Sequence, residues 1–253
     1  MLDLVQKIFV ANFLRYFIAA APAFLLFYIL FKQKWQHKKI QSRYPKRSDY
    51  IREIGYSMIT VLIFAGIGYL VFGTDIRLYT QVYPNIEDYG WSWWTISIVL
   101  MILLHDTYFY WTHRAMHHPK LFRIFHLVHH KSTNPSPWAA YAFHPLEGIV
   151  EASVIFPIVF LIPFHVSALI VFLIFMIVYN VYGHLGFELL PKGFNMHPIG
   201  KWLNTSVNHN MHHKHFEGNY GLYFLFWDRK MDTLHPKYDE TYTRVDNMRS
   251  ITE

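Results

Sequence analysis

The sequence contains no cysteine among its 253 residues, and this absence removes several kinds of site at once. Without thiols, the chain itself offers no disulfide framework, no thiolate zinc site, no iron–sulfur cluster and no cysteine nucleophile. It also lacks a G-x-G-x-x-G phosphate loop and a C-x-x-C-H haem motif, so no dinucleotide or c-type haem site is expected. Any metal must therefore be held by nitrogen or oxygen ligands, and any electrons must come from another protein.

Charged residues are also scarce, at 16% of the chain against 53% hydrophobic residues. The formal net charge of +6 first suggests either nucleic acid or an anionic membrane surface as a partner. Eight Lys or Arg residues fall within 32–52, immediately after an apolar run, which is typical of a cytoplasmic flank. No base-stacking motif accompanies them, so we expect a membrane and no nucleic-acid partner.

Three apolar runs, 13–31, 55–73 and 92–111, are each long enough to cross a bilayer, which takes about 20 residues. Arg15 lies near one end of the first run, where its side chain could reach the membrane surface. With 32–52 in the cytoplasm, the third run returns His105 and the residues after it to the cytoplasmic side.

A fourth apolar stretch, 148–183, is broken by Pro157 and by a turn at Pro163. It predicts a hairpin of two helices that enters and leaves on the cytoplasmic side, which brings His184 beside the earlier histidines. We expect one integral-membrane domain over 1–253: three spans and the basic loop within about 8–111, a first histidine segment at 112–147, the hairpin at 148–184 and a cap at 185–253. The predicted fold class is an all-α membrane protein with about four transmembrane helices, a re-entrant or hairpin element and a cytoplasmic, histidine-lined helical cap.

Histidine is abundant: there are 17, with seven in 105–130 and four in 209–215. H-R-A-M-H (113–117) places two at i, i+4, and H-L-V-H-H (126–130) and H-N-M-H-H (209–213) each place three at i, i+3, i+4. On a helix these intervals bring the rings to one face, where a metal about 2.0–2.1 Å from each nitrogen can collect them. A lone histidine on an apolar face is more often an ordinary core residue. Because a buried imidazole without a partner costs about 1–3 kcal/mol, so many together indicate a shared ligand.

With His184 included, nine histidines are candidate catalytic and metal-binding residues: His113, His117, His126, His129, His130, His184, His209, His212 and His213. One tetrahedral zinc needs three or four ligands, so nine indicate two metal ions. Imidazole suits iron, zinc and copper alike. Context favours two iron ions, because an all-nitrogen pair at a membrane surface, facing an apolar substrate, suits dioxygen activation better than hydrolysis. Zinc could take their place in a purified or crystallised form.

These histidine motifs resemble the fatty acid hydroxylase and sterol desaturase superfamily over about 100–235, together with D-T-Y-F-Y-W (106–111), A-F-H-P-L-E (142–147), N-Y-G (219–221) and W-D-R (227–229). The runs H-P-L-E-G and N-Y-G-L-Y-F-L-F-W-D-R are closest to its sterol-desaturase-like members. The resemblance implies an integral-membrane, non-haem di-iron oxygenase with the nine histidines as ligands. Such an enzyme would hydroxylate or desaturate an unactivated C–H position of a lipid from the bilayer. It would use O2 and electrons from an external ferredoxin, cytochrome or reductase.

Several residues stay open at this stage. Some members of the superfamily have a second histidine four residues after the position of His184, where this chain has Glu188. One metal would then have a carboxylate, a water or an open position. His105 and His144 are further candidates for ligands or for their supports. The carboxylates that could accept hydrogen bonds from ligating imidazoles are Asp106, Glu147, Glu188 and Asp228.

Two other functions also stay open. A membrane zinc hydrolase would use a few of these histidines with a glutamate as base, although H-E-x-x-H is absent. A non-catalytic metal- or lipid-binding protein would need affinity alone. The basic segment 32–52 could dock an acidic electron donor, although cytoplasmic anchoring explains it more simply. We expect an integral-membrane protein with its active site on the cytoplasmic side, in the inner membrane if the host is bacterial.

Overall fold

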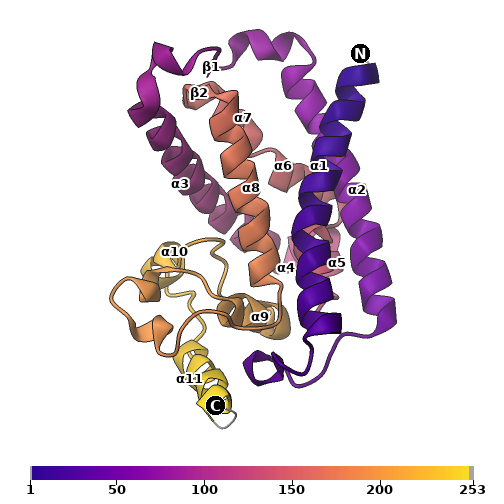
Figure 1. Cartoon of the computed structure of the whole chain (residues 1–253), viewed down its shortest axis with the longest axis vertical. Coiled ribbons are helices and arrows are strands. Elements are labelled where there is room, and N and C mark those ends of the chain that lie inside the picture. The colour runs from indigo at the N-terminus through magenta and orange to yellow at the C-terminus, as the bar shows by residue number, and fades with distance from the viewer. Residues whose placement is uncertain (1, 251–253) are drawn as a thin grey trace.

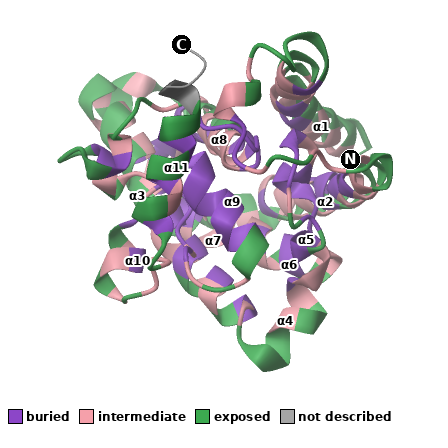
Figure 2. Ribbon diagram, turned by 90° about the horizontal axis from the view of Figure 1, so that it is seen from below, coloured by how far each residue is buried: buried purple, intermediate pink, exposed green. Residues whose placement is uncertain are grey.

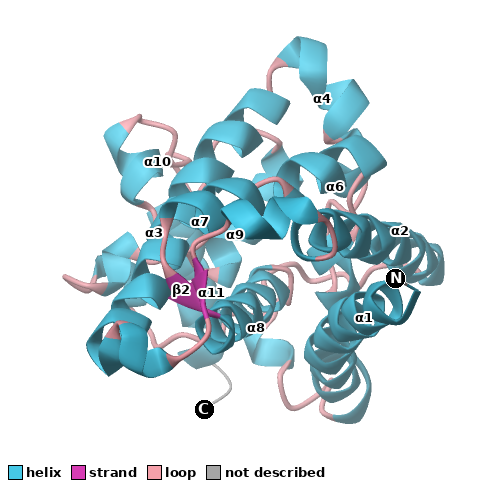
Figure 3. Cartoon of the chain, turned by 90° about the horizontal axis from the view of Figure 1, so that it is seen from above, coloured by secondary structure: helices cyan, strands magenta, loops and turns pink. Residues whose placement is uncertain are grey.

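The computed structural model describes residues 2–250 and consists almost wholly of helices (Figures 1 and 3). Four long helices form the upper part of Figure 1: α1 (Leu2–Phe24), α2 (Arg47–Phe72), α3 (Gly90–Met116) and α8 (Val166–Gly183). The short α-helices are α4 (Pro119–Phe125), α5 (Leu127–His130), α6 (Pro145–Ala152), α7 (Ile155–Leu161), α9 (Ser206–His215), α10 (Phe226–Lys230) and α11 (Tyr238–Ser250). A π-helical segment, Leu25–Leu30, extends α1, and 3-10 turns occupy Gln36–Lys38, Asp75–Tyr79, Ile86–Asp88, Pro137–Tyr141, Phe194–Met196 and Gly200–Trp202.

One two-stranded parallel sheet joins two distant parts of the described chain. β1 (Val82–Tyr83) pairs with β2 (Phe164–His165), with Val82 opposite Phe164. This contact lies at the opposite end of the molecule from α9 and α11 (Figure 1). The pairing joins the loop before α3 to the residues just before α8. The chain turns at Pro163, immediately before β2, as predicted for the hairpin.

Three helical segments are long and apolar enough to cross a membrane: Leu2–Leu30, Arg47–Phe72 and Val166–Gly183. Their outward faces expose large apolar side chains, among them Leu14, Leu62 and Val178. Exposed apolar surface on this scale is unfavourable in water and favourable in lipid. The helices therefore support a membrane location.

The first predicted run differs from the helix that contains it. The run begins at residue 13, but α1 already begins at Leu2, where Leu4, Gln6 and Lys7 have good helix propensity. Arg15 therefore lies near the middle of α1 rather than near an end, and it contacts protein instead of reaching the membrane surface.

Three helices of the described chain are candidate spans, and the count of about four stays a prediction. α3 covers the predicted run 92–111 as one helix. It is not among the three candidates. The first limb of the hairpin is also no single span, since the chain turns at Ser153 and Val154 between α6 and α7.

α9 is the central element at the lower end of the molecule. Its residues from Ser206 to His213 are all buried, and Figure 2 shows it in purple, surrounded by the other helices. The helix begins where the hydroxyl of Thr205 accepts the Asn208 N–H at 3.1 Å, a usual N-cap. It ends at Phe216, whose φ of 67° is left-handed. Both ends of the most histidine-rich helix are thus fixed.

Candidate metal centre

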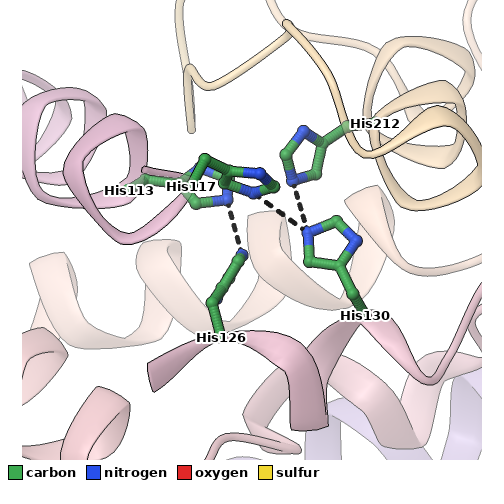
Figure 4. Close-up of side chains that lie close together, drawn as sticks. All are labelled: His113, His117, His126, His130 and His212. Atoms are coloured by element: carbon green, nitrogen blue, oxygen red, sulfur yellow. Dashed lines mark hydrogen bonds between the residues drawn. The ribbon is translucent and has the colours of Figure 1, made fainter. Parts of the chain in front are cut away.

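Five histidines converge near the end of α3 (Figure 4). His113 and His117 come from the end of α3, His126 and His130 flank α5, and His212 comes from α9. The Nε2 atom of His113 lies 2.9 Å from that of His126, and the Nε2 atom of His130 lies 3.1 Å from that of His117 and 3.0 Å from that of His212. We call these five residues the first histidine group.

Four more histidines, His129, His184, His209 and His213, form a second histidine group. The Nε2 atom of His184 lies 3.3 Å from that of His129, 3.0 Å from that of His209 and 3.2 Å from that of His213. The nine candidates from the sequence thus all come together, in groups of five and four. The groups adjoin each other, since the rings of His130 and His213 are 5.0 Å apart.

The protonation of His113 and His126 can be read from their Nδ1 atoms. In His113 this atom lies 2.9 Å from the carbonyl oxygen of Tyr220, and in His126 it lies 2.6 Å from the carboxylate of Glu147. A carbonyl oxygen only accepts, so Nδ1 of His113 carries the proton and its Nε2 is a bare lone pair, and an ionised Glu147 selects the same tautomer in His126. With Glu147 ionised, the two Nε2 atoms face each other at 2.9 Å without a proton between them.

His184 and His212 follow the same rule. Their Nδ1 atoms donate to the carbonyl oxygens of Asn180, at 2.8 Å, and of Gly218, at 2.7 Å. Lone pairs that face each other repel unless a cation lies among them. Neighbouring ligands about 2.0–2.1 Å from one metal ion are separated by about 2.9–3.4 Å. The closest Nε2 pairs here are 2.9 to 3.3 Å apart, and all the ligand atoms of each group lie within 4.8 Å of one another. Both groups therefore fit a metal ion.

Burial keeps these imidazoles neutral, which is the form that binds metal. Loss of solvation lowers the pKa of His184 and of His212 to about 4, although their bonds to carbonyl oxygens act in the opposite direction. It lowers the pKa of His117 to about 2. The pKa values of the other six are also well below the usual range for the same reason: His113, His126, His129, His130, His209 and His213.

Of the predicted supporting carboxylates, one contacts a histidine directly and two act through a loop. Glu147 accepts directly from His126. Asp228 accepts the backbone N–H groups of Tyr220 and Gly221 at 2.9 and 2.8 Å, and Asp106 accepts those of Tyr223 and Phe224 at 2.8 and 3.1 Å. Both aspartates thus hold the loop 218–224, whose carbonyl oxygens orient His113 and His212.

The residues left open by the sequence lie outside both groups. The carboxylate of Glu188 accepts from the Tyr182 hydroxyl at 2.7 Å and from the Val207 N–H at 3.0 Å, and so it fixes the start of α9. His105 is bonded to the Tyr223 hydroxyl at 2.9 Å. His144 caps α6 by accepting from the N–H of Leu146.

A signal for the capping histidines is present in the sequence but lies outside the spacing pattern. Four histidines directly precede proline, and in each the ring Nδ1 accepts the backbone N–H two residues later: His118, His144, His197 and His235. Proline favours the first position of a helix or turn, and the ring takes the place of the usual Ser or Asp cap. The dipeptide His-Pro therefore separates His144 from the metal-site candidates.

An apolar cavity of about 580 Å³ lies among α1, α2, α3, α6, α7 and α8, and two of its lining residues contact the histidine groups. Phe143, one of its walls, has its ring 5.1 Å from that of His129, and Phe109 has its ring 4.9 Å from that of His113. Trp111 does not line this cavity, since it packs on Trp227 and is exposed.

Comparison with known proteins defines the class. The family model for fatty acid hydroxylases matches residues 98–233, more than half of the chain, and the chain belongs to this family. Over 223 residues it is 31% identical to a Delta(7)-sterol 5(6)-desaturase of Gibberella zeae, covering 87% of this chain and 65% of that protein. Over 163 residues it is 32% identical to lathosterol oxidase of Rattus norvegicus, covering 63% and 52%. The chain thus spans between half and two thirds of these relatives' length. No solved structure matches it.

Glu147→Gln tests the support of the first histidine group. The neutral amide is a weaker acceptor for the N–H of His126, so we expect the affinity for metal to fall about 10- to 100-fold. Competition with a chelator, followed by metal analysis, measures this. Glu151→Gln, one turn further along α6, is the control and should leave the affinity unchanged. Equal affinities in the wild type and Glu147→Gln would contradict the role of Glu147.

Acid should destabilise the metal-free protein. His184 and His212 titrate near pH 4 when folded and near 6.5 when unfolded, so the unfolded chain binds more protons between these values. Stability is therefore complete above about pH 6.5 and falls as the pH drops toward 4. Urea unfolding of the protein in chelator, followed by circular dichroism across this range, measures the effect. A constant free energy of unfolding from pH 7 to pH 4 would count against neutral, buried imidazoles.

Proposed function

We propose that this protein is a membrane-bound di-iron oxygenase that hydroxylates or desaturates an unactivated C–H position of a lipid. The nine histidines of the two groups would be the ligands, five around one iron ion and four around the other. The observation that carries this proposal is that two adjoining groups of histidine nitrogens lie behind Phe109 and Phe143, which line an apolar cavity. A hydrolytic site would need neither the second group nor an apolar cavity.

The residues of the chain itself would bind the metal ions, orient the histidine ligands and exclude water from the site. The carbonyl oxygens of loop 218–224 and the carboxylate of Glu147 keep Nδ1 protonated, so that the lone pairs face the metal positions. Phe109 and Phe143 separate the histidines from water and place hydrocarbon beside them. Iron bound by these nitrogens would supply dioxygen activation and the one-electron chemistry that breaks an unactivated C–H bond.

Substrate entry from the bilayer is supported by side chains that line the cavity and are also exposed on the outside. Ile18 of α1 and Ile170, Ile174 and Val178 of α8 have this double position. They mark a lateral opening between the two helices, through which a lipid can pass without crossing water. Since the relatives are named for sterols, a sterol or a lipid of similar shape is the proposed substrate.

Electrons would arrive from an external donor at the opposite face of α9. A second pocket, of about 610 Å³, is lined there by five cations and one carboxylate: Lys39, Arg43, Lys214, Lys237, Arg244 and Glu240. Met211 and Lys214 of α9 border this pocket, whereas His209, His212 and His213 of the same helix face the metal positions. We propose that an acidic redox protein docks here, on the cytoplasmic side.

His129→Ala tests the assignment of ligands. Loss of one of the four nitrogens should lower the iron content of the second histidine group and reduce product formation by at least about a hundredfold. His165→Asn is the control, because it keeps the cap of α8 at the far end of the same hairpin. Iron analysis and lipid mass spectrometry, which detects a gain of one oxygen or a loss of two hydrogens, measure both variants. Turnover without O2, or full activity with one zinc ion, would refute the proposed oxygenase.

Donor docking is tested by Lys214→Glu combined with Lys237→Glu. Two reversed charges at the pocket should raise the donor's apparent KM about tenfold or more and weaken its salt dependence, with kcat little changed. Lys120→Glu, on the exposed α4, serves as the control. Steady-state kinetics with an acidic ferredoxin at several salt concentrations gives the result. An unchanged KM in the double variant would exclude this pocket as the docking site.

A further inference from the structure

One cation lies inside the apolar cavity. Arg15 belongs to a stripe of α1 that lines this cavity: Ile8, Ala11, Asn12, Arg15, Ile18 and Ala19. Spacings of three and four residues keep these six on one face of the helix. Leu14 and Phe17 lie on other faces and are exposed. The guanidinium group therefore lines the cavity from the middle of a helix that is long and apolar enough to cross a membrane.

The contacts of this guanidinium group are incomplete. Its Nη2 atom donates to the Asn12 side chain at 2.8 Å and to the Tyr141 hydroxyl at 3.2 Å. Its Nε atom is buried and has no hydrogen-bond partner in the protein. Ion pairs within the described chain involve Asp3, Asp49 and Glu147, so no carboxylate lies within 4.0 Å of Arg15. A charge in the middle of such a helix is costly unless it is paired, and for this reason it usually marks a functional site.

A continuous wall leads from Arg15 to the second histidine group. Tyr141 accepts from Arg15, and its ring lies 6.3 Å from that of Phe143, which in turn lies 5.1 Å from that of His129. A lipid along this wall would have one end at Arg15 and a carbon beside His129. Most of the other lining residues are aliphatic or aromatic, so the body of such a ligand must be hydrocarbon.

We propose that Arg15, positioned by Asn12 and Tyr141, binds the oxygen-bearing group of an otherwise apolar lipid and so determines which carbon lies beside the histidines. Arginine can only donate hydrogen bonds, so this group must accept them, as a hydroxyl or a carboxylate does. The inference rests on the proposed function and adds to it a specificity-determining residue. Glu151, which lines the same cavity, forms no ion pair with Arg15.

The test measures binding without turnover, using iron-loaded protein in lipid nanodiscs under argon. Two pairs of probes differ only in the oxygen-bearing group: cholesterol against cholestene, and oleic acid against heptadecene. In at least one pair, the oxygen-bearing member should bind about tenfold or more tightly, as expected for a hydrogen bond to a charged group. The pair that shows the preference identifies the head group as hydroxyl or carboxylate.

Arg15→Met should abolish this preference while binding of the hydrocarbon members stays within twofold. Lys7→Met is the matched control, because Lys7 is on the same helix but exposed and paired with Asp3 at 2.7 Å. If Arg15→Met does not fold, Arg15→Gln takes its place and should reduce the preference at least threefold. A preference that survives in these variants, equal weakening of both members of a pair, or no preference in the wild type would overturn the inference.

Failure of this inference and failure of the proposed function are distinguishable. The binding comparison uses no oxygen and no electron donor, whereas the oxygenase is tested by iron content and O2-dependent product. Normal turnover without any head-group preference would remove only the role of Arg15. In the active enzyme, Arg15→Met should also spread the reaction over more than one carbon, which mass spectrometry of the product detects.

Discussion

The arrangement of this protein depends on lone pairs that face one another in a buried space. His113 keeps its proton on Nδ1, as does His126 when Glu147 is ionised, and their bare Nε2 atoms then lie 2.9 Å apart. Such a contact is repulsive without a cation, yet the surrounding chain maintains it on every side. Loop 218–224, the end of α8 and Glu147 each supply an acceptor that selects this tautomer. The fold thus orients the imidazoles toward positions that fit metal ions.

The two histidine groups and the apolar cavity depend on each other. Removal of water keeps the imidazoles neutral and able to bind metal, and the same apolar walls would accept a hydrocarbon substrate. Asp106 and Asp228 accept hydrogen bonds from the loop 218–224 rather than from the histidines, and they hold this loop in place. The carbonyl oxygens of this loop accept hydrogen bonds from the histidines. Membership of the fatty acid hydroxylase family and the sterol desaturase relatives agree with a site of this construction.

Much of the candidate site could be predicted because it is local in the chain. Spacings of three and four residues bring histidines to one face whatever surrounds the helix, and all nine candidates came together. The same rule left the role of His144 open, since spacing carries no information on the proline that follows a capping histidine. It also could not separate His129 from His130. These neighbours have rings at 90° to each other and belong to different groups.

The sequence by itself determined the helical class, the apolar segments and the set of histidines, because these follow from composition and short-range periodicity. Only the tertiary structure decided how five and four histidines divide, since each group takes rings from segments up to about a hundred residues apart. It also decided that the hairpin's first limb is two short helices and that Glu188 fixes α9 instead of joining the histidines. The sequence predicted Arg15 as a surface anchor, whereas the structure places it in the lining of the cavity. The start of a helix and the residues that pack on it depend on contacts along the whole chain, and no local pattern contains these contacts.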